Sequence, residues 1–314
     1  MSATARISVV LLFLVILATP VEAQTRDRGP LVLELPASTR ALALGDAFQL
    51  ATRDSDAIFY HPGRVARAQG LKASLQRFSA NGNLTTLSAG QDWFGGGVAL
   101  GLQNLTYEAP ARASHDVNDI LALSADEASL REAGDVAVSE TVLSAGYGRT
   151  LFGLQMGVVG KYVEQRFDYR KAGSVAVDLG GATSAGPLTL GLSVQNLGPD
   201  LSFRGGDIPL PTRFILGASS DGAPVGPLDV AASTALTYRL DGDLVPSIGL
   251  EVGYWPVNGR TFVGRVGYRY RSDDYTACPL TFGAAFLGDN INLEYAYQGF
   301  EDGDPSHRFS VGWR

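Results

Sequence analysis

The three histidines are the first residues to test for chemistry, because imidazole is the side chain that most often acts as a general acid or base. They are His61, His115 and His307, and Ser306 directly precedes the last of them. Consecutive residues of a β-strand point to opposite faces, so Ser306 and His307 do not form a catalytic dyad. The sequence therefore predicts no enzyme and no cofactor.

Clustered carboxylates are the second candidates, since acidic side chains with glycine between them can hold calcium. Such clusters are Asp241/Asp243, Asp273/Asp274 and Glu301/Asp302/Asp304. None has the full ligand spacing of a calcium loop. Solvated loop tips are the better interpretation, and no metal site is predicted.

Isolated charges in the middle of otherwise apolar stretches form the third set. They are Lys161, Glu251, Arg265, Arg269 and Glu294. If these side chains point inward, opposite charges on facing walls form a structural network. The alternative is a role in selectivity, in which an arginine anchors the carboxylate of a fatty-acid-like ligand.

Short strands must position these residues, because apolar and polar residues alternate over most of the chain. From Ile291 to Gln298, for example, Ile291, Leu293 and Tyr295 share one face while Glu294 lies on the other. Alternation with a period of two is typical of strands with one apolar face. Glycine- and aspartate-rich turns separate the strands.

The alternation predicts fourteen strands. They are Leu71–Ser79, Leu84–Phe94, Gly97–Thr106, Val136–Arg149, Phe152–Phe167, Ser174–Thr183, Leu188–Leu197, Thr212–Ser220, Leu228–Arg239, Val245–Trp255, Thr261–Tyr270, Leu280–Leu287, Ile291–Gln298 and Arg308–Trp313. Short and long connections alternate, as they do between the two ends of a membrane barrel. The exception is Asp221–Pro227, which is long for a turn at the short end. The longest connection is Tyr107–Asp135.

Composition favours a transmembrane barrel over a soluble sandwich. Hydrophobic residues make up 45% of the chain, yet no long helical periodicity is present, and glycine reaches 38 of 314 residues. Aromatic residues such as Trp93, Tyr254 and Trp313 gather at strand ends, as interfacial girdles require. The formal charge of −7 disfavours a nucleic-acid partner.

The N-terminus predicts export. Arg6 precedes an apolar run from Ile7 to Leu17, and Pro20 is followed by small residues suited to cleavage after Ala23. The run is shorter than the roughly 20 residues that a membrane-spanning helix needs. We therefore expect residues 1–23 to be a cleaved signal peptide and the mature chain to reach the bacterial outer membrane.

Residues 24–70 are expected to form an N-terminal periplasmic or plug segment, and residues 71–314 the barrel. The stretch between Arg40 and Ala66 is too apolar for a free tail, and the lumen is the only large interior available. Asp54 or Asp56 is expected to cap a short helix that ends near Tyr60, ahead of Pro62. The candidate plug or ligand-contacting residues are Arg40, Leu42, Leu44, Phe48, Ile58, Phe59 and His61.

Two patterns in this segment carry a family resemblance. Arg-Ala-x-x-x-Gly-x-Ala-Phe runs from Arg40 to Phe48, and Asp-x-x-Ala-x-x-Tyr-x-Pro-x-x-x-Ala runs from Asp54 to Ala66. They resemble the N-terminal signature of PorV/PorQ outer-membrane proteins, relatives of the FadL long-chain fatty acid channels. The resemblance implies a fourteen-stranded antiparallel transmembrane β-barrel, all-β, with a luminal plug. The chain departs from the family's Asn-Pro-Ala-Gly at His61-Pro62-Gly63-Arg64.

Two functions remain open from the sequence. The first is a FadL-like conduit or binder for hydrophobic small molecules, such as a long-chain fatty-acid-like ligand, with outer-membrane lipid around the barrel. It predicts an apolar cavity lined by plug residues, or a bulge that opens the wall. The second is a PorV-like partner in type IX-like secretion, binding secreted cargo or secretion-system subunits. It predicts a blocked lumen and a binding surface on the outer loops, especially Tyr107–Asp135.

Overall fold

The computed structural model describes residues 29–50, 53–78, 82–110, 135–168, 170–203, 206–240, 244–257, 259–270, 277–301 and 303–313. The helical elements are η1 (Leu31–Leu33), α2 (Thr39–Ala43), α3 (Ala57–Tyr60) and η2 (Pro62–Arg67). The strands of the barrel wall are β1 (Gly70–Arg77), β2 (Asn83–Trp93), β3 (Gly96–Pro110), β4 (Asp135–Leu151), β5 (Leu154–Phe167), β6 (Arg170–Ala185), β7 (Leu188–Leu197), β10 (Arg213–Ser220), β12 (Leu228–Arg239), β13 (Leu244–Val257), β14 (Arg260–Arg269), β15 (Ala277–Leu287), β16 (Ile291–Phe300) and β17 (Ser306–Trp313). Three short strands are β8 (Leu201–Phe203), β9 (Gly206–Ile208) and β11 (Ala223–Val225).

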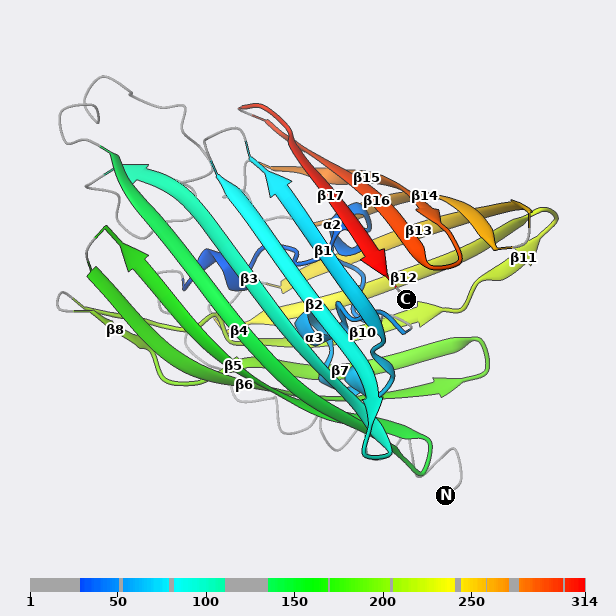
Figure 1. The fold of residues 1–314 in the computed structure, drawn as a ribbon, viewed down its shortest axis with the longest axis horizontal. Helices are drawn as coiled ribbons and strands as arrows, with labels where there is room; N and C mark the ends of the chain where they lie inside the picture. Colours follow the sequence, from blue (N-terminus) through cyan, green and yellow to red (C-terminus); the bar gives the residue numbers. More distant parts are fainter. Residues whose placement is uncertain are drawn as a thin grey trace.

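Fourteen strands form a closed antiparallel barrel (Figure 1). Each wall strand pairs with its neighbours in the chain, β1 pairs with β17, and β10 pairs with β12. Closure leaves no strand edge with unpaired backbone groups, which is the condition for a sheet to stand in lipid. The predicted fourteen-stranded all-β barrel is confirmed.

The strand boundaries differ from those expected at several places. β4 and β6 extend beyond the predicted Val136–Arg149 and Ser174–Thr183, because backbone ladders continue into polar residues outside the apolar band. The connection Gly198–Pro211 contains the β8–β9 hairpin, and the long turn Asp221–Pro227 contains β11. Such three-residue strands carry too few residues for a period of two to be read.

Side chains alternate between the lumen and the outer surface. On β1, Lys72, Ser74 and Gln76 are buried, whereas Leu71 and Leu75 are more than half exposed on the outside. Large apolar side chains are exposed in this way around the whole wall, which a soluble monomer does not tolerate. Among the described residues, no helix is long and apolar enough to cross a membrane.

The short turns at one end carry aromatic tips. Phe94 and Phe152 both have positive φ, at 49° and 52°, and each is followed by a glycine with positive φ. A left-handed conformation costs a residue with a Cβ about 1–2 kcal/mol. Both rings are largely exposed, so they extend the aromatic girdle at this end of the barrel. We call it the short-turn end and the opposite one the long-loop end.

The N-terminal residues 29–50 and 53–69, here called the luminal segment, lie inside the barrel, with α2 and α3 surrounded by the wall in Figure 1. Glycines of the wall let its backbone approach closely. A Cβ atom at Gly97, Gly148 or Gly157 would lie under 3.0 Å from backbone atoms of η2, and one at Gly267 would overlap the backbone at Gly45. We call these four residues the glycine seat.

We expect a methyl group added at the glycine seat to destabilise the folded barrel, and one added at an outward-facing glycine to leave its stability unchanged. Gly157→Ala is expected to cost about 1–3 kcal/mol, because the new Cβ overlaps the carbonyl oxygen of Pro62 and the packed lumen cannot yield easily. Gly264→Ala is the matched control, because Gly264 faces outward with no atom within 4 Å. Denaturant unfolding of the folded barrel in detergent measures both, and equal stabilities would contradict the tight docking.

Candidate functional site

The luminal segment descends through the barrel from the long-loop end to the short-turn end. Gly29 packs against Pro209 and Pro211 in the connection that follows β9, and η2 packs against β3 to β6 beside the short turns. Between them, α2 contacts β14 to β16 on the opposite wall. The segment therefore contacts much of the wall before the chain enters β1.

Apolar side chains fill the long-loop half of the lumen. Leu31, Val32 and Leu33 of η1 are buried in one cluster with residues of β2 to β6 and with Leu201 and Ile208 of the β8–β9 hairpin. Burying a leucine-sized side chain contributes about 1.5–3 kcal/mol. In the described part of the chain this half of the lumen is occupied by the protein's own residues.

Two buried polar side chains of the wall, a guanidinium and a carboxyl group, hold this half of the segment by its backbone. Arg308 of β17 donates to the carbonyl oxygens of Pro36 and Ala37, at 2.6 Å for Pro36, and also to Ser74. Glu140 of β4 accepts the N–H of Val32 at 2.7 Å. Hydrogen bonds to charged groups contribute about 1.5–3 kcal/mol each, more than neutral ones.

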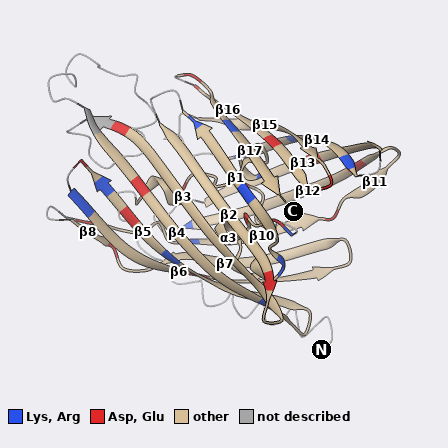
Figure 2. Cartoon of the chain, in the orientation of Figure 1, with Lys and Arg blue, Asp and Glu red and all other residues tan. Residues whose placement is uncertain are grey.

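Ion pairs cross the middle of the lumen and link the segment to the wall. Arg40 of α2 forms a two-point pair with Glu251 of β13, at 2.7 and 2.9 Å, and Arg265 of β14 also donates to Glu251. On the other side, the ammonium group of Lys72 lies 3.1 Å from both Asp54 and Asp56. Figure 2 shows charges recurring along the strands of the wall.

Glu294 of β16 joins the two halves, 3.3 Å from Lys72 and 3.6 Å from Arg265. We call the whole set the luminal ion network. Its members are Arg40, Asp54, Asp56, Lys72, Glu251, Arg265 and Glu294. Three cations thus face four carboxylates, an excess of one negative charge when all are ionised. Removing one partner of such a buried network costs about 3–5 kcal/mol, because it strands the opposite charge.

Burial sets the protonation of the segment's own groups. Burial raises the pKa of Asp56 to about 6, with Lys72 opposing the shift and Asp54 adding to it. Burial, followed by the charge of Arg64, lowers the pKa of His61 to about 3, so its ring is neutral. The excess carboxylate of the luminal ion network is therefore the group that gains a proton near pH 6.

A cavity of about 210 Å³ lies in the short-turn half, between the segment and the wall from β10 to β14. Leu44, Phe48 and Leu50 form its segment side, and Val263 and Glu251 contribute from the wall. The guanidinium of Arg40 stacks on the ring of Phe48 at 4.4 Å. The cavity thus has an apolar side, formed by the segment, and a polar wall side that carries hydroxyl groups and further charged residues, among them Asp221 and Asp229.

Among the described strands the register of the wall shifts in three pairs, and one of these irregular places, between β6 and β7, lies beside the long-loop half of the lumen. The β6–β7 register shifts between Val177 and Leu179, and Asn196 has a positive φ of 59°. Asp178 accepts the Asn196 N–H at 2.7 Å, and Lys161 lies 2.7 Å from Asp178. This bulge is sealed by a buried charge pair, so it does not open the wall.

The structure brings some of the predicted residues together and separates others. Arg40, Leu44 and Phe48 line the cavity, whereas Leu42, Ile58, Phe59 and His61 are buried elsewhere in the segment. Among the inward charges, Glu251, Arg265 and Glu294 join the luminal ion network. Lys161 pairs with Asp178, and Arg269 lies 3.6 Å from Asp46.

Further expectations concerned the cap of the α3 helix and the orientation of Ser306 and His307. The α3 helix ends at Tyr60 as expected, but Asp56 does not cap it, since its carboxylate accepts from Ser88 and pairs with Lys72. Ser306 is buried while His307 is exposed, as alternation requires. Among the described residues no three His, Cys, Asp or Glu side chains are arranged to hold a metal ion.

Sequence reasoning missed Lys72, Glu140 and Arg308, which hold the segment. Their signal was present, since each is a charge at an inward position of an alternating strand. The partners of Arg308 and Glu140 could not be predicted, because they are backbone carbonyl and N–H groups, which are the same in nearly every residue type.

Comparison with solved structures identifies the fold as that of hydrocarbon channels. The toluene transporter TodX of Pseudomonas putida matches with a TM-score of 0.56 at 13% identity, over 92% of this chain and 98% of that one. The toluene transporter TbuX of Ralstonia pickettii matches at 0.53 and 14%, over 88% and 98%. A Pseudomonas aeruginosa FadL homologue matches at 0.51 and 11%, over 88% and 98%. No protein-family model and no curated protein matches the sequence.

The hydrogen bonds from Arg308 to the backbone of the luminal segment give one test of how the segment is held. Arg308→Met keeps the length of the side chain but leaves the carbonyl oxygens of Pro36 and Ala37 without donors. We expect a loss of about 3 kcal/mol or more, measured by denaturant unfolding. Arg260→Met, at an exposed site on β14, is the control. Equal stability of the two variants would show that the hydrogen bonds from Arg308 do not hold the segment.

Acid sensitivity gives a second test, at His61. Its pKa falls from 6.5 in the unfolded chain to about 3 in the folded one, so the neutral ring's contribution is complete above pH 6.5 and is lost as pH falls toward 3. His61→Phe is expected to lose less stability than the wild type over this window. Arg260→Met, at an exposed site on β14, is the control and is expected to follow the wild-type profile. An unchanged pH profile for His61→Phe would show that the ring is not buried as described.

Proposed function

We propose that the protein is an outer-membrane conduit for hydrophobic small molecules. Three observations support this: a closed barrel with an apolar outer face, a fold shared with channels described as toluene transporters, and an N-terminus with the features of an export signal. In this proposal residues 1–23 are removed after export. The long-loop end then faces outward, and residues 24–70 act as the plug.

The observation that carries the proposal is the cavity of about 210 Å³ beside Leu44, Phe48 and Leu50. Sites for small ligands combine apolar side chains with placed polar groups, and here Leu44, Phe48 and Leu50 supply the apolar side while the wall supplies hydroxyl and charged groups. An engineered cavity of about 150 Å³ in another protein binds benzene, so this volume suits a compound of one ring. A long-chain fatty acid needs more room than the cavity has in this state.

The structure corresponds to the closed state of such a conduit. The η1 residues occupy the long-loop half of the lumen, and the luminal ion network lies between them and the cavity. A ligand entering from the long-loop end reaches the cavity only when the η1 end of the segment moves aside. The polar contacts of Arg308 and Glu140 set the free energy of that movement.

A matched pair of substitutions on β12 tests the cavity. Both Ala231 and its neighbour Ala232 border the cavity, but strand alternation points the side chain of Ala231 inward, beside Glu251, and exposes that of Ala232 on the outer face. Ala231→Phe should fill the cavity and weaken binding of trifluorotoluene about tenfold or more, since about 1.4 kcal/mol of lost contact is a factor of ten. Ala232→Phe should bind as the wild type does. Fluorine NMR line broadening of trifluorotoluene, with the protein in detergent, measures binding.

The transport step is tested in cells. A strain that lacks its own hydrocarbon channels and expresses the wild type should take up labelled toluene faster than one expressing Ala231→Phe. Binding that is absent in the wild type, or equal in the two variants, would contradict the proposed ligand site.

A PorV/PorQ-like role in protein secretion is the second candidate. The occupied long-loop half of the lumen favours it, because a secretion partner needs no open path. Its expected binding surface, Tyr107–Asp135, lies largely outside the described residues. A wild type that binds no trifluorotoluene but co-purifies with secreted proteins would select this candidate.

A further inference from the structure

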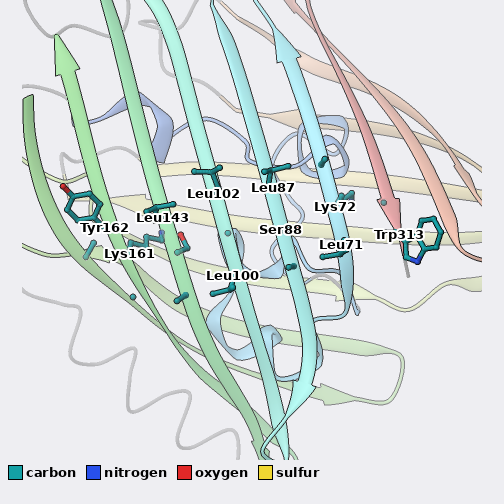
Figure 3. Close-up of a pocket in the computed structure, with 18 of the residues that line it drawn as sticks. Leu71, Lys72, Leu87, Ser88, Leu100, Leu102, Leu143, Lys161, Tyr162 and Trp313 are labelled. Atoms are coloured by element: carbon teal, nitrogen blue, oxygen red, sulfur yellow. The ribbon is translucent and has the colours of Figure 1, made fainter. Parts of the chain in front are cut away.

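The outer face of the wall from β17 to β6 carries a hollow of about 1100 Å³, shown in Figure 3. Its floor contains the small outward residues Ala89, Ala145 and Gly160, which are neighbours across the strands through Leu100. Leucine and valine side chains form its sides, and Tyr162 and Trp313 mark its two ends. The hollow is therefore a feature of the lipid-facing surface and not of the lumen.

A hollow in this position is filled by hydrocarbon, because water there would leave apolar surface wet. The question is whether its occupant is any lipid or a particular class. The answer depends on what lies at the edge of the apolar band beside it.

Arg77, the last residue of β1, stands at that edge. Its side chain is exposed on the outer face, and among the described residues no acidic group lies within ion-pair distance of it. The outward residue before it is Leu75, and before that is Ala73, which lines the hollow. An unpaired guanidinium next to lipid requires an anionic partner, and phosphate is the partner that its paired N–H groups fit best.

His307 lies beside Arg77 on β17, in register with it. The hydroxyl of Tyr295 is 2.8 Å from Nδ1 of His307, and the ring of Tyr297 packs edge-on against the imidazole. In the tautomer with the ring proton on Nε2, the Tyr295 hydroxyl donates to Nδ1 and Nε2 is free to donate. His307 is thereby held in place with a second donor beside the guanidinium.

The position of Arg77 along the membrane normal matches that of a lipid headgroup. Its register partner Asn83 stands ten residues from Trp93 on β2, which has 11 residues. At about 3.3 Å per residue and a tilt of about 40°, this stretch rises about 25 Å, the height of the apolar band of a membrane barrel. Arg77 and His307 are therefore level with headgroups at the long-loop end, while Trp93 marks the opposite interface.

We propose that Arg77 and His307 bind the phosphate of an anionic membrane lipid whose acyl chain lies over Leu75 and in the hollow. This site is on the outside of the barrel and is separate from the proposed conduit. It requires only that the barrel spans a bilayer. The lipid would hold the short β1 and β17 strands, where the barrel closes, against the surrounding membrane.

Lipid binding to the purified full-length mature barrel tests the headgroup site by native mass spectrometry. The probes are dimyristoylphosphatidylglycerol and dimyristoylphosphatidylcholine, which share acyl chains and differ in net charge. The wild type should bind the anionic lipid about tenfold more tightly, a difference of about 1.4 kcal/mol. Arg77→Gln combined with His307→Gln should abolish this preference.

Lys171→Gln is the matched control for charge, because Lys171 is an exposed cation of the outer face already 3.6 Å from Glu164. It should keep the preference. For the hollow, Ala89→Phe should weaken binding of both lipids, whereas Ala232→Phe on the far wall should not. An unchanged preference in the double variant, or equal binding by Ala89→Phe and Ala232→Phe, would overturn the proposal.

Discussion

The close approach of the luminal segment to the wall is the constraint on which the rest of the structure depends. Eight strands enclose a lumen that side chains can fill, whereas sixteen leave a water channel, so a barrel of fourteen needs extra chain inside to be closed. The segment supplies it, and the glycine seat lets its backbone rest directly on the strands. The barrel and the segment thus form one packed unit that leaves a cavity of about 210 Å³ in the short-turn half.

Hydrogen bonds and ion pairs with charged groups of the wall fix the position of the luminal segment within the packed lumen. Backbone groups of the segment are held by Arg308 and Glu140, while its side chains enter the luminal ion network through Arg40, Asp54 and Asp56. Isolated charges at these depths would be costly, but each has a partner within the lumen. The same interactions that keep the segment in place would have to be exchanged before a ligand could pass. In the proposed conduit, the residues that hold the segment in place are therefore also the ones whose contacts oppose opening.

The sequence predicts the barrel well, because alternation and strand number follow from residue types alone. It also places the N-terminal segment inside, since residues 40–66 are too apolar for a free tail. It predicts partners poorly. Asp54 or Asp56 was expected to cap α3, but the carboxylate of Asp56 pairs with Lys72 of β1, and that of Asp54 accepts the N–H of Asp56. The sequence shows that Arg308 is a charged residue of the last strand, but not that it donates to backbone carbonyl groups, since every residue has one. The hollow beside Arg77 depends on how rows of side chains align across the seven strands from β17 to β6, and that register is set by the closure of the barrel.

The most direct test of the account is the ion conductance of single barrels in a planar lipid bilayer. The mature chain is compared with a variant that lacks residues 29–69, and only preparations that migrate as folded barrels on unheated gels are used. If the segment closes the lumen, the mature chain shows no large steady conductance and the shortened chain shows large open steps. Large steps of equal size in both would contradict it, because the lumen would then conduct with the segment in place.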